Sequence, residues 1–513
     1  MVAGPIRFGG RTALRLALFY LAAAVFGAAA LVAQTEEQAQ ESQRAKELMA
    51  AGKYEEAIPL YQKLVQGLPG NTGMLMNLAL AEHMAGRENE SIPHFEAVLK
   101  AQPNLVPALL SLAEARLALH DPKPAQAPLE KVVALDPQNR DARGMLASVF
   151  LDAGRFEQAA AQFRELSALA PDDPQAWYGL GTSYQGLAGS AFERLQKTAQ
   201  ASPFVSALLA DTRVQRRQYA SAFLLYREVL KQLPKLHGIH TALAEIYRKT
   251  GHAEWAADED AREAALPAAD CHAHPAECEF LAGHDVALTA SAHSAAPSAE
   301  ALFWQAKAAN ELALQAFFRL GQLPESVEQH RLKAEIARAQ RRHLESLQEW
   351  RSALALAPGN PGIKREIAVS LFMAADYKSA LDEASALLQT DPRSAELNFI
   401  AGDCLVRLEQ PEAAIPYLRA ALAADPTLRA ADASIGLALS RLGKSAEAIP
   451  HLQKALDLDD DGSLHYQLSS AYRAAGQAEK ARAAMQEYQE IVKRNQEQKD
   501  EAARDAQISP PGK

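Results

Sequence analysis

Small and bulky apolar residues recur along the chain at a fixed step of 34 residues. With a recurring proline taken as position 32 of each repeat unit, positions 7 and 8 hold a leucine and then a small residue, position 20 is small, and position 24 is mostly bulky and apolar. In the first block these positions are Leu78-Ala79, Leu112-Ala113, Leu146-Ala147 and Leu180-Gly181; Ala57, Ser91, Ala125 and Ala159; and Tyr61, Phe95, Leu129 and Phe163. Small residues allow two helices to approach closely, whereas bulky ones fill the space between units. The pattern therefore predicts a pair of helices in every unit.

The recurring proline ends the second helix of each unit, because proline lacks an amide hydrogen and biases the preceding residue away from helical backbone angles. The prolines that keep the step are Pro69, Pro103, Pro137, Pro171, Pro358, Pro392 and Pro426. One helix pair cannot bury its apolar face alone, so such units stack against neighbours. The sequence predicts an all-α solenoid.

Two stretches carry further characteristic residues at fixed positions of the repeat unit. One contains Trp177, Leu180, Gly181 and Tyr184; the other contains Tyr247, Gly251 and Ala256. Over most of residues 38–490 the chain resembles the tetratricopeptide repeat family, whose repeats have 34 positions. The resemblance implies a right-handed α-solenoid of about 12–13 units, two of them shortened, that binds other proteins. It also implies that the first helix of each unit lines a concave groove with its positions 5 and 9.

The two shortened units interrupt the regular step. Full units begin near Gln38, Thr72, Val106 and Arg140, and a fifth begins at Pro174, with a second helix containing AFERL at 191–195. A second short unit spans roughly 298–326 and contains AFFRL at 316–320. The shared motif favours duplication of a block of units, and chance similarity is the alternative.

The N-terminal residues 1–33 differ from the repeats. Arg7, Arg11 and Arg15 precede an apolar run from Leu16 to Ala33, which is typical of a secretory signal peptide. The run is also long enough to serve as an uncleaved membrane anchor. We therefore expect an exported protein, periplasmic or extracellular, or alternatively one anchored to the inner membrane and facing outward.

The step is lost again in an irregular insert at 268–297, between an N-terminal array at 34–267 and a C-terminal array at 298–490. Cys271 and Cys278 lie in the insert, and an exported chain favours a disulfide between them. The alternatives are two free thiols, or a metal site formed by these cysteines with His272 and His274. The insert is either a hinge or docking element, or one more helix pair. Cys404 is expected in the core. Residues 491–513 are expected to form a polar helix extension that frays into a disordered tail.

Composition and motifs exclude other classes of function. The net charge of -10 and the pI near 5.8 argue against nucleic acid as a partner. The sequence has no catalytic or nucleotide-binding motif, so we expect no enzyme activity, no cofactor and no metal. His83, His94 and His240 have no carboxylate or cysteine partner at a metal-ligand spacing in the sequence, so we expect them to be surface or packing residues.

Function must then be sought on the groove of the solenoid. The predicted partner-binding residues are Met76, Leu80, Leu110 and Tyr178, an apolar set that suits an amphipathic helix or an extended peptide. The alternative is that these side chains pack on neighbouring helices. The sequence thus predicts a non-catalytic adaptor or scaffold for other proteins. The second hypothesis is a component that binds carbohydrate or an envelope polymer, with Tyr178, Trp177 or Trp304 stacking on sugars.

Overall fold

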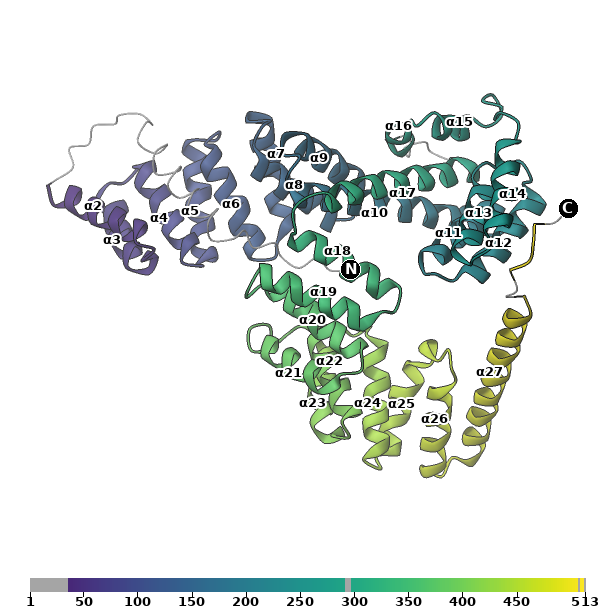
Figure 1. The fold of residues 1–513 in the computed structure, drawn as a ribbon. Helices are drawn as coiled ribbons and strands as arrows, with labels where there is room; N and C mark the ends of the chain where they lie inside the picture. Colours follow the sequence, from purple (N-terminus) through teal and green to yellow (C-terminus); the bar gives the residue numbers. More distant parts are fainter. Residues whose placement is uncertain (1–35, 291–296, 506–507, 512–513) are drawn as a thin grey trace. The chain divides into compact units, whose positions relative to one another are not determined.

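The computed structural model describes residues 36–290, 297–505 and 508–511, and every regular element among them is a helix. Consecutive helices form antiparallel pairs, and each pair packs on the next, as the purple to blue and the green to yellow helices of Figure 1 show. The predicted α-solenoid is confirmed. The predicted signal peptide or anchor at 1–33 lies outside the described residues. Within them, no helix combines the length and the apolar character that crossing a bilayer requires.

The helix bounds follow the repeat step closely. The first helices are α2 (Glu36–Ala50), α3 (Tyr54–Gly67), α4 (Thr72–Met84), α5 (Glu88–Ala101), α6 (Val106–Ala118), α7 (Pro122–Leu135), α8 (Arg140–Asp152), α9 (Phe156–Leu169) and α10 (Pro174–Thr198). The middle helices are α11 (Pro203–Gln215), α12 (Tyr219–Gln232), α13 (Ile239–Lys249), α14 (Ala253–Ala264), α15 (Pro275–Leu281), α16 (Asp285–Ala290) and α17 (Ala299–Gly321).

The remaining helices lie after the second short unit. They are α18 (Val327–Ala339), α19 (His343–Leu356), α20 (Pro361–Met373), α21 (Tyr377–Leu388), α22 (Ala395–Arg407), α23 (Pro411–Ala424), α24 (Arg429–Arg441), α25 (Ser445–Lys454), the 3-10 turn η3 (Leu456–Leu458), α26 (Ser463–Ala474) and α27 (Ala478–Asp505). The helix α27 continues to Asp505, into the stretch for which a polar helix extension followed by a disordered tail was expected.

The recurring prolines lie in the turns between units, two residues before a helix cap. Asn71, Asn139 and Asn360 each follow such a proline by two positions, and their side chains accept hydrogen bonds from the first-turn amides of α4, α8 and α20. A side-chain acceptor at this place satisfies an amide that the helix itself leaves unpaired. The proline therefore ends one helix just before the next one is capped.

Position 4 of several units ties the first helix to the preceding proline. The side chains of Arg143, Trp177 and Asn398 donate to the carbonyl oxygens of Pro137, Pro171 and Pro392, at 2.8, 2.9 and 3.0 Å. Three chemically different donors reach the same acceptor, because the turn between units keeps the same geometry.

Position 15, in the turn inside each unit, adopts positive φ in every unit in which a turn separates the two helices. Some units have glycine there, such as Gly154 and Gly251. Others have a side chain: His120, Arg217, Arg341, Ala375 and Glu409 have φ between 58° and 62°. Left-handed backbone is the usual way to end a helix, and it costs residues with a Cβ more than it costs glycine.

The core positions that the apolar pattern predicts are buried. Ala57, Ser91, Ala125 and Ala159 at position 20 are fully buried, and Tyr61, Phe95, Leu129 and Phe163 at position 24 are at most 2% exposed. The small residues let the paired helices approach, and the bulky ones fill the space between consecutive pairs.

The two shortened units are single long helices, which corrects the prediction that each contains a helix pair. The first is α10, of 25 residues, and the second is α17, of 23 residues. In α10 three of the four glycines face large rings: a Cβ on Gly179, Gly181 or Gly186 would lie 2.2–2.3 Å from an atom of Phe163, Phe317 or Phe156, respectively. The glycines serve close helix packing rather than a turn.

The chain divides into two compact bodies, and the division does not fall at the insert. The first body holds the described residues up to Ala188 together with Ala309–Pro324, and the second holds Gly189–Ala308 and Glu325 onwards. The three boundaries lie within or next to the long helices α10 and α17.

The insert contains the disulfide and two short helices. Cys271 and Cys278 are bonded, with a distance of 2.09 Å between their sulfurs. Cys278 lies in α15, which contacts α16. Because both thiols are consumed by the disulfide, the alternative metal site that used them with His272 and His274 is wrong.

Candidate functional site

The predicted groove residues lie mostly inside the first body. Met76, Leu110 and Tyr178 are 5%, 3% and 7% exposed, and Leu80 is half-buried against the cluster that holds Met76. The ring of Tyr178 packs beside that of Phe317, with centroids 6.4 Å apart. These contacts correspond to the alternative in which the side chains pack on neighbouring helices, so they leave a partner little apolar surface at these positions.

The aromatic residues proposed to stack on sugars are also engaged within the chain. Trp304 is 1% exposed and packs between the rings of Phe280 and Phe303, with centroids 4.9 and 4.8 Å away. The indole NH of Trp177 donates to Pro171, and the guanidinium of Arg319 lies 5.7 Å from its ring centroid. Trp304 therefore offers no free face to a sugar, and Arg319 covers one face of the Trp177 ring.

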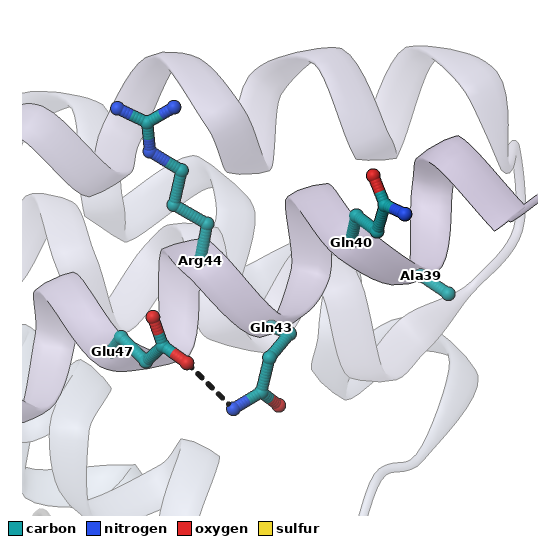
Figure 2. Close-up of a pocket in the computed structure, with 5 residues that line it drawn as sticks. All are labelled: Ala39, Gln40, Gln43, Arg44 and Glu47. Carbon is teal, nitrogen blue, oxygen red and sulfur yellow. Dashed lines mark hydrogen bonds between the residues drawn. The ribbon is translucent and has the colours of Figure 1, made fainter.

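A shallow depression on the first body follows one side of α2 and is shown in Figure 2. Its lining residues are Ala39, Gln40, Gln43, Arg44 and Glu47, and Gln43 donates a 3.0 Å hydrogen bond to Glu47. All five belong to a single helix. The depression gathers no groups from different elements, so its shape alone indicates no particular ligand.

A surface of the second body is covered by the C-terminal segment of the chain, Ile508–Pro511. Ile508 packs against the apolar cluster formed mainly by α11–α13. The Tyr247 hydroxyl on α13 donates to the carbonyl oxygen of Ser509 at 2.7 Å, and Arg227 on α12 donates to the Ser509 hydroxyl at 2.8 Å. We call this surface, defined by Arg227, Tyr247 and the aromatic residues around them, the tail site.

Aromatic rings form the wall of the tail site. The ring of Tyr247 lies edge-on to those of Phe223 and Trp255, with centroids 5.7 and 5.6 Å away, and His252 stacks on Trp255 at 4.0 Å. Arg227 is exposed and lies 5.6 Å above the ring of Phe223. Burial, with a smaller effect of Glu259, raises the pKa of Tyr247 to about 12, so its hydroxyl stays protonated and able to donate.

Sequence reasoning did not find the tail site. In their units, Tyr247 holds position 11 and Arg227 position 25, whereas the groove was assigned to positions 5 and 9. Tyr247 was noted as a mark of the repeat, and the segment that covers it was placed in a disordered tail. The pairing joins residues 262 positions apart, for which the repeat pattern gives no indication.

A polar group in the second body occupies a predicted groove position. Asp211, at position 9, accepts hydrogen bonds from the Tyr226 hydroxyl at 2.5 Å and from the Lys307 ammonium at 3.1 Å. Burial and the neighbouring Asp211 raise the pKa of Tyr226. The carboxylate is thus engaged by groups of α12 and α17, which fix its position.

His83, His94 and His240 each contact a carboxylate that the sequence did not point to. Their Nδ1 atoms lie 2.7, 2.6 and 2.5 Å from carboxylate oxygens of Glu88, Glu82 and Glu259. A related pattern joins positions 4 and 23 of single units in His240–Glu259, His330–Glu349 and Asp432–His451. Positions 4 and 23 of a unit face each other across its helix pair. A histidine and an acidic residue 19 positions apart in the sequence would therefore have predicted these three contacts between positions 4 and 23.

Cys404 lies in the core, as its position in the repeat predicts. Its side chain is fully buried on α22, and burial, together with Asp403, raises the pKa of the thiol to about 12. The thiolate is the nucleophilic form of cysteine, so this residue is a poor nucleophile at neutral pH.

Comparison with known proteins finds tetratricopeptide repeat models at residues 42–106, 116–181, 366–428 and 434–505. Among curated proteins, no sequence matches the chain. MamA from Desulfovibrio magneticus RS-1 is 22% identical over 33% of this chain and 96% of its own, with a TM-score of 0.30. A thermophilic TPR protein of Thermus thermophilus is 19% identical over 35% and 98%, with a TM-score of 0.29.

A third solved structure, a tetratricopeptide repeat protein from Parabacteroides merdae ATCC 43184, is 10% identical over 66% of this chain and 100% of its own, with a TM-score of 0.32. The repeat models fall on regular helix pairs in both the earlier and the later part of the chain. Proteins with such repeats are in general scaffolds for protein–protein interaction and are typically not catalysts. The chain belongs to the tetratricopeptide repeat family.

Proposed function

We propose that this chain is a peptide-binding scaffold whose tail site accepts extended, proline-containing segments of partner proteins. The observation that carries the proposal is the seating of Ile508 and Ser509 on α12 and α13. The segment offers an aliphatic side chain, a backbone carbonyl, a hydroxyl and then two prolines. The aliphatic side chain packs on the apolar cluster, the carbonyl accepts a hydrogen bond from Tyr247, and the hydroxyl accepts one from Arg227.

The chemistry of the tail site suits this class of ligand. Proline-rich segments are already extended, so they lose little conformational entropy on binding, and aromatic-lined surfaces recognise them. The tail site supplies aromatic rings together with a hydroxyl and a guanidinium as hydrogen-bond donors. Ile508–Pro511 then acts as an internal competitor, which a partner segment displaces. Because this competitor is part of the same chain, only a partner with higher affinity or higher local concentration replaces it.

We further propose that the scaffold works outside the cytoplasmic membrane. The charged start and apolar run of residues 1–33 support export, and the Cys271–Cys278 disulfide is of the kind that exported proteins keep. Fractionation of cells that produce the full chain, with the disulfide state determined by thiol labelling, tests this location.

A peptide competition experiment tests the binding function. A fluorescent peptide with the sequence of residues 506–513 is added to the chain ending at Asp505 and to the full chain, and anisotropy is measured. We expect clear binding to the shortened chain and much weaker binding to the full chain. Tyr247→Phe together with Arg227→Ala should weaken binding, whereas Tyr472→Phe, at the same repeat position but without a tail contact, should not. Equal binding of a scrambled peptide, or no binding to the shortened chain, would contradict the proposal.

A further inference from the structure

The loop closed by the disulfide brings a histidine close to two carboxylates from different elements. His274 lies directly before α15, Glu277 is in α15, and Glu300 is in the first turn of α17. The Nδ1 atom of His274 lies 3.0 Å from both carboxylate oxygens of Glu300. One potential ligand atom from each of the three residues lies within 4.8 Å of the other two.

A second histidine orients the buried member of this group. Glu277 is only 6% exposed, and its Oε1 atom lies 2.9 Å from Nδ1 of His237, just before α13. The backbone amide of His237 also donates to the same oxygen at 3.4 Å. His237 therefore holds Glu277 in place, within reach of His274 and Glu300.

We propose that His274, Glu277 and Glu300 form a binding site for a divalent transition-metal ion such as Zn²⁺. Imidazole nitrogen and carboxylate oxygen are ordinary ligands of zinc, at about 2.0–2.2 Å from the ion. The ligand atoms of His274, Glu277 and Glu300 lie within 4.8 Å of one another, and the ligands of a single ion lie somewhat closer together than that. Small side-chain rotations would therefore complete the site. His237 orients Glu277 through a hydrogen bond, as partners of metal ligands commonly do.

The disulfide gives the site its rigidity. Cys271 and Cys278 enclose His274 and Glu277 in a short covalent loop, so the two ligands cannot separate widely. Linking residues in this way reduces the conformational freedom that a ligand would otherwise have to remove. The ligand set differs from the one suggested by sequence, since the two cysteines supply the loop and the ion is held by a histidine and two glutamates.

The simpler arrangement is two separate pairs, His237 with Glu277 and His274 with Glu300, that bind no ion. The two arrangements differ in a measurable way. A metal site binds a single ion per chain, and its affinity falls when any ligand is removed. Separate pairs bind no ion at all, and removing His274 then changes only a local contact.

Calorimetric titration of the full-length, untagged protein with Zn²⁺, after removal of bound metal with a chelator, tests the proposal. We expect one ion per chain, and a loss of affinity of at least ~10-fold in His274→Ala and in Glu300→Gln. His284→Ala is the matched control: His284 lies in the same insert and has a partner of its own, Glu279, at 2.8 Å, so its removal should leave binding unchanged.

A second measurement separates loss of the site from loss of the fold. Cys271→Ser with Cys278→Ser, which opens the loop without adding free thiols, should weaken Zn²⁺ binding while circular dichroism shows unchanged helix content. Absence of stoichiometric binding by the intact protein would overturn the proposal. So would equal affinity of the intact protein, His274→Ala and Glu300→Gln, since the ion would then be bound elsewhere.

Discussion

The phenolic hydroxyl of Tyr247 donates a 2.7 Å hydrogen bond to the backbone carbonyl of Ser509, 262 residues further along the chain. The bond fixes the C-terminal segment by its backbone, so other sequences with the same extended shape can form it too. Arg227 adds a contact to the side chain of Ser509, which gives the site a preference for a hydroxyl at that place.

Tyr247→Phe should release part of the tail without changing the repeats. A hydrogen bond of this kind contributes about 1 kcal/mol, so a several-fold larger share of chains should have the segment detached. Methyl NMR of Ile508 measures this, because its methyl groups pack against the aromatic-rich cluster when the segment is seated. We expect its signals to move toward random-coil positions in the variant and to stay in place in Tyr472→Phe. Unchanged Ile508 signals in Tyr247→Phe would show that the hydroxyl does not hold the tail.

His83 should make the stability of the first body depend on pH above neutrality. Burial alone would lower the pKa of His83, but Glu114 and Glu88 outweigh it and raise the pKa to about 9. A group whose pKa is raised on folding stabilises the protein fully below its unfolded pKa of about 6.5, and this contribution disappears as pH rises through about 9.

Denaturant unfolding of the protein and of His83→Gln between pH 6 and pH 9.5 tests this dependence. The difference in free energy of unfolding between the two proteins should shrink by an amount on the order of 2 kcal/mol across the range. A difference that stays constant with pH would show that His83 is not held in its charged form.

Gly181→Ala should destabilise the first body. A Cβ at this position would lie 2.3 Å from Cε1 of Phe317, and the ring is packed against Tyr178. Overpacking of this kind costs roughly 1–3 kcal/mol, which exceeds the gain of up to about 1 kcal/mol from replacing glycine by alanine in a helix. Thermal unfolding measures the effect. Gly189→Ala, in the same helix with nothing within 4 Å of the added Cβ, should be neutral or stabilising.

Ala375→Gly should stabilise the second body. Ala375 ends the first helix of its unit with φ of 62°, a conformation that most other units give to glycine. Relief of the Cβ penalty exceeds the entropy that glycine adds to the unfolded chain, so we expect a gain of about 0.5–1 kcal/mol. Ala374→Gly, where φ is -82°, should show no gain. Equal effects of the two substitutions in denaturant unfolding would contradict this explanation.

The sequence alone determined the family, the phase of the repeat and the buried positions of the regular units. These features are local and periodic: the proline, the cap two residues later and the small residue at position 20 act within one unit or between adjacent units. Position 20, for example, is buried in each unit of the first block because the same packing recurs there. The disulfide was also predictable, because it joins two cysteines close together in the sequence.

Tertiary structure decided the features that depend on which elements become neighbours. The AFERL and AFFRL segments continue as the single helices α10 and α17, where glycines meet the rings of Phe156, Phe163 and Phe317 instead of forming a turn. The burial of Met76 and Leu110 follows from the stacking of units, and the meeting of Tyr247 with Ser509 follows from the path of α27. A repeat specifies its contacts with adjacent units, whereas contacts between distant segments depend on side chains that the repeat leaves free to vary.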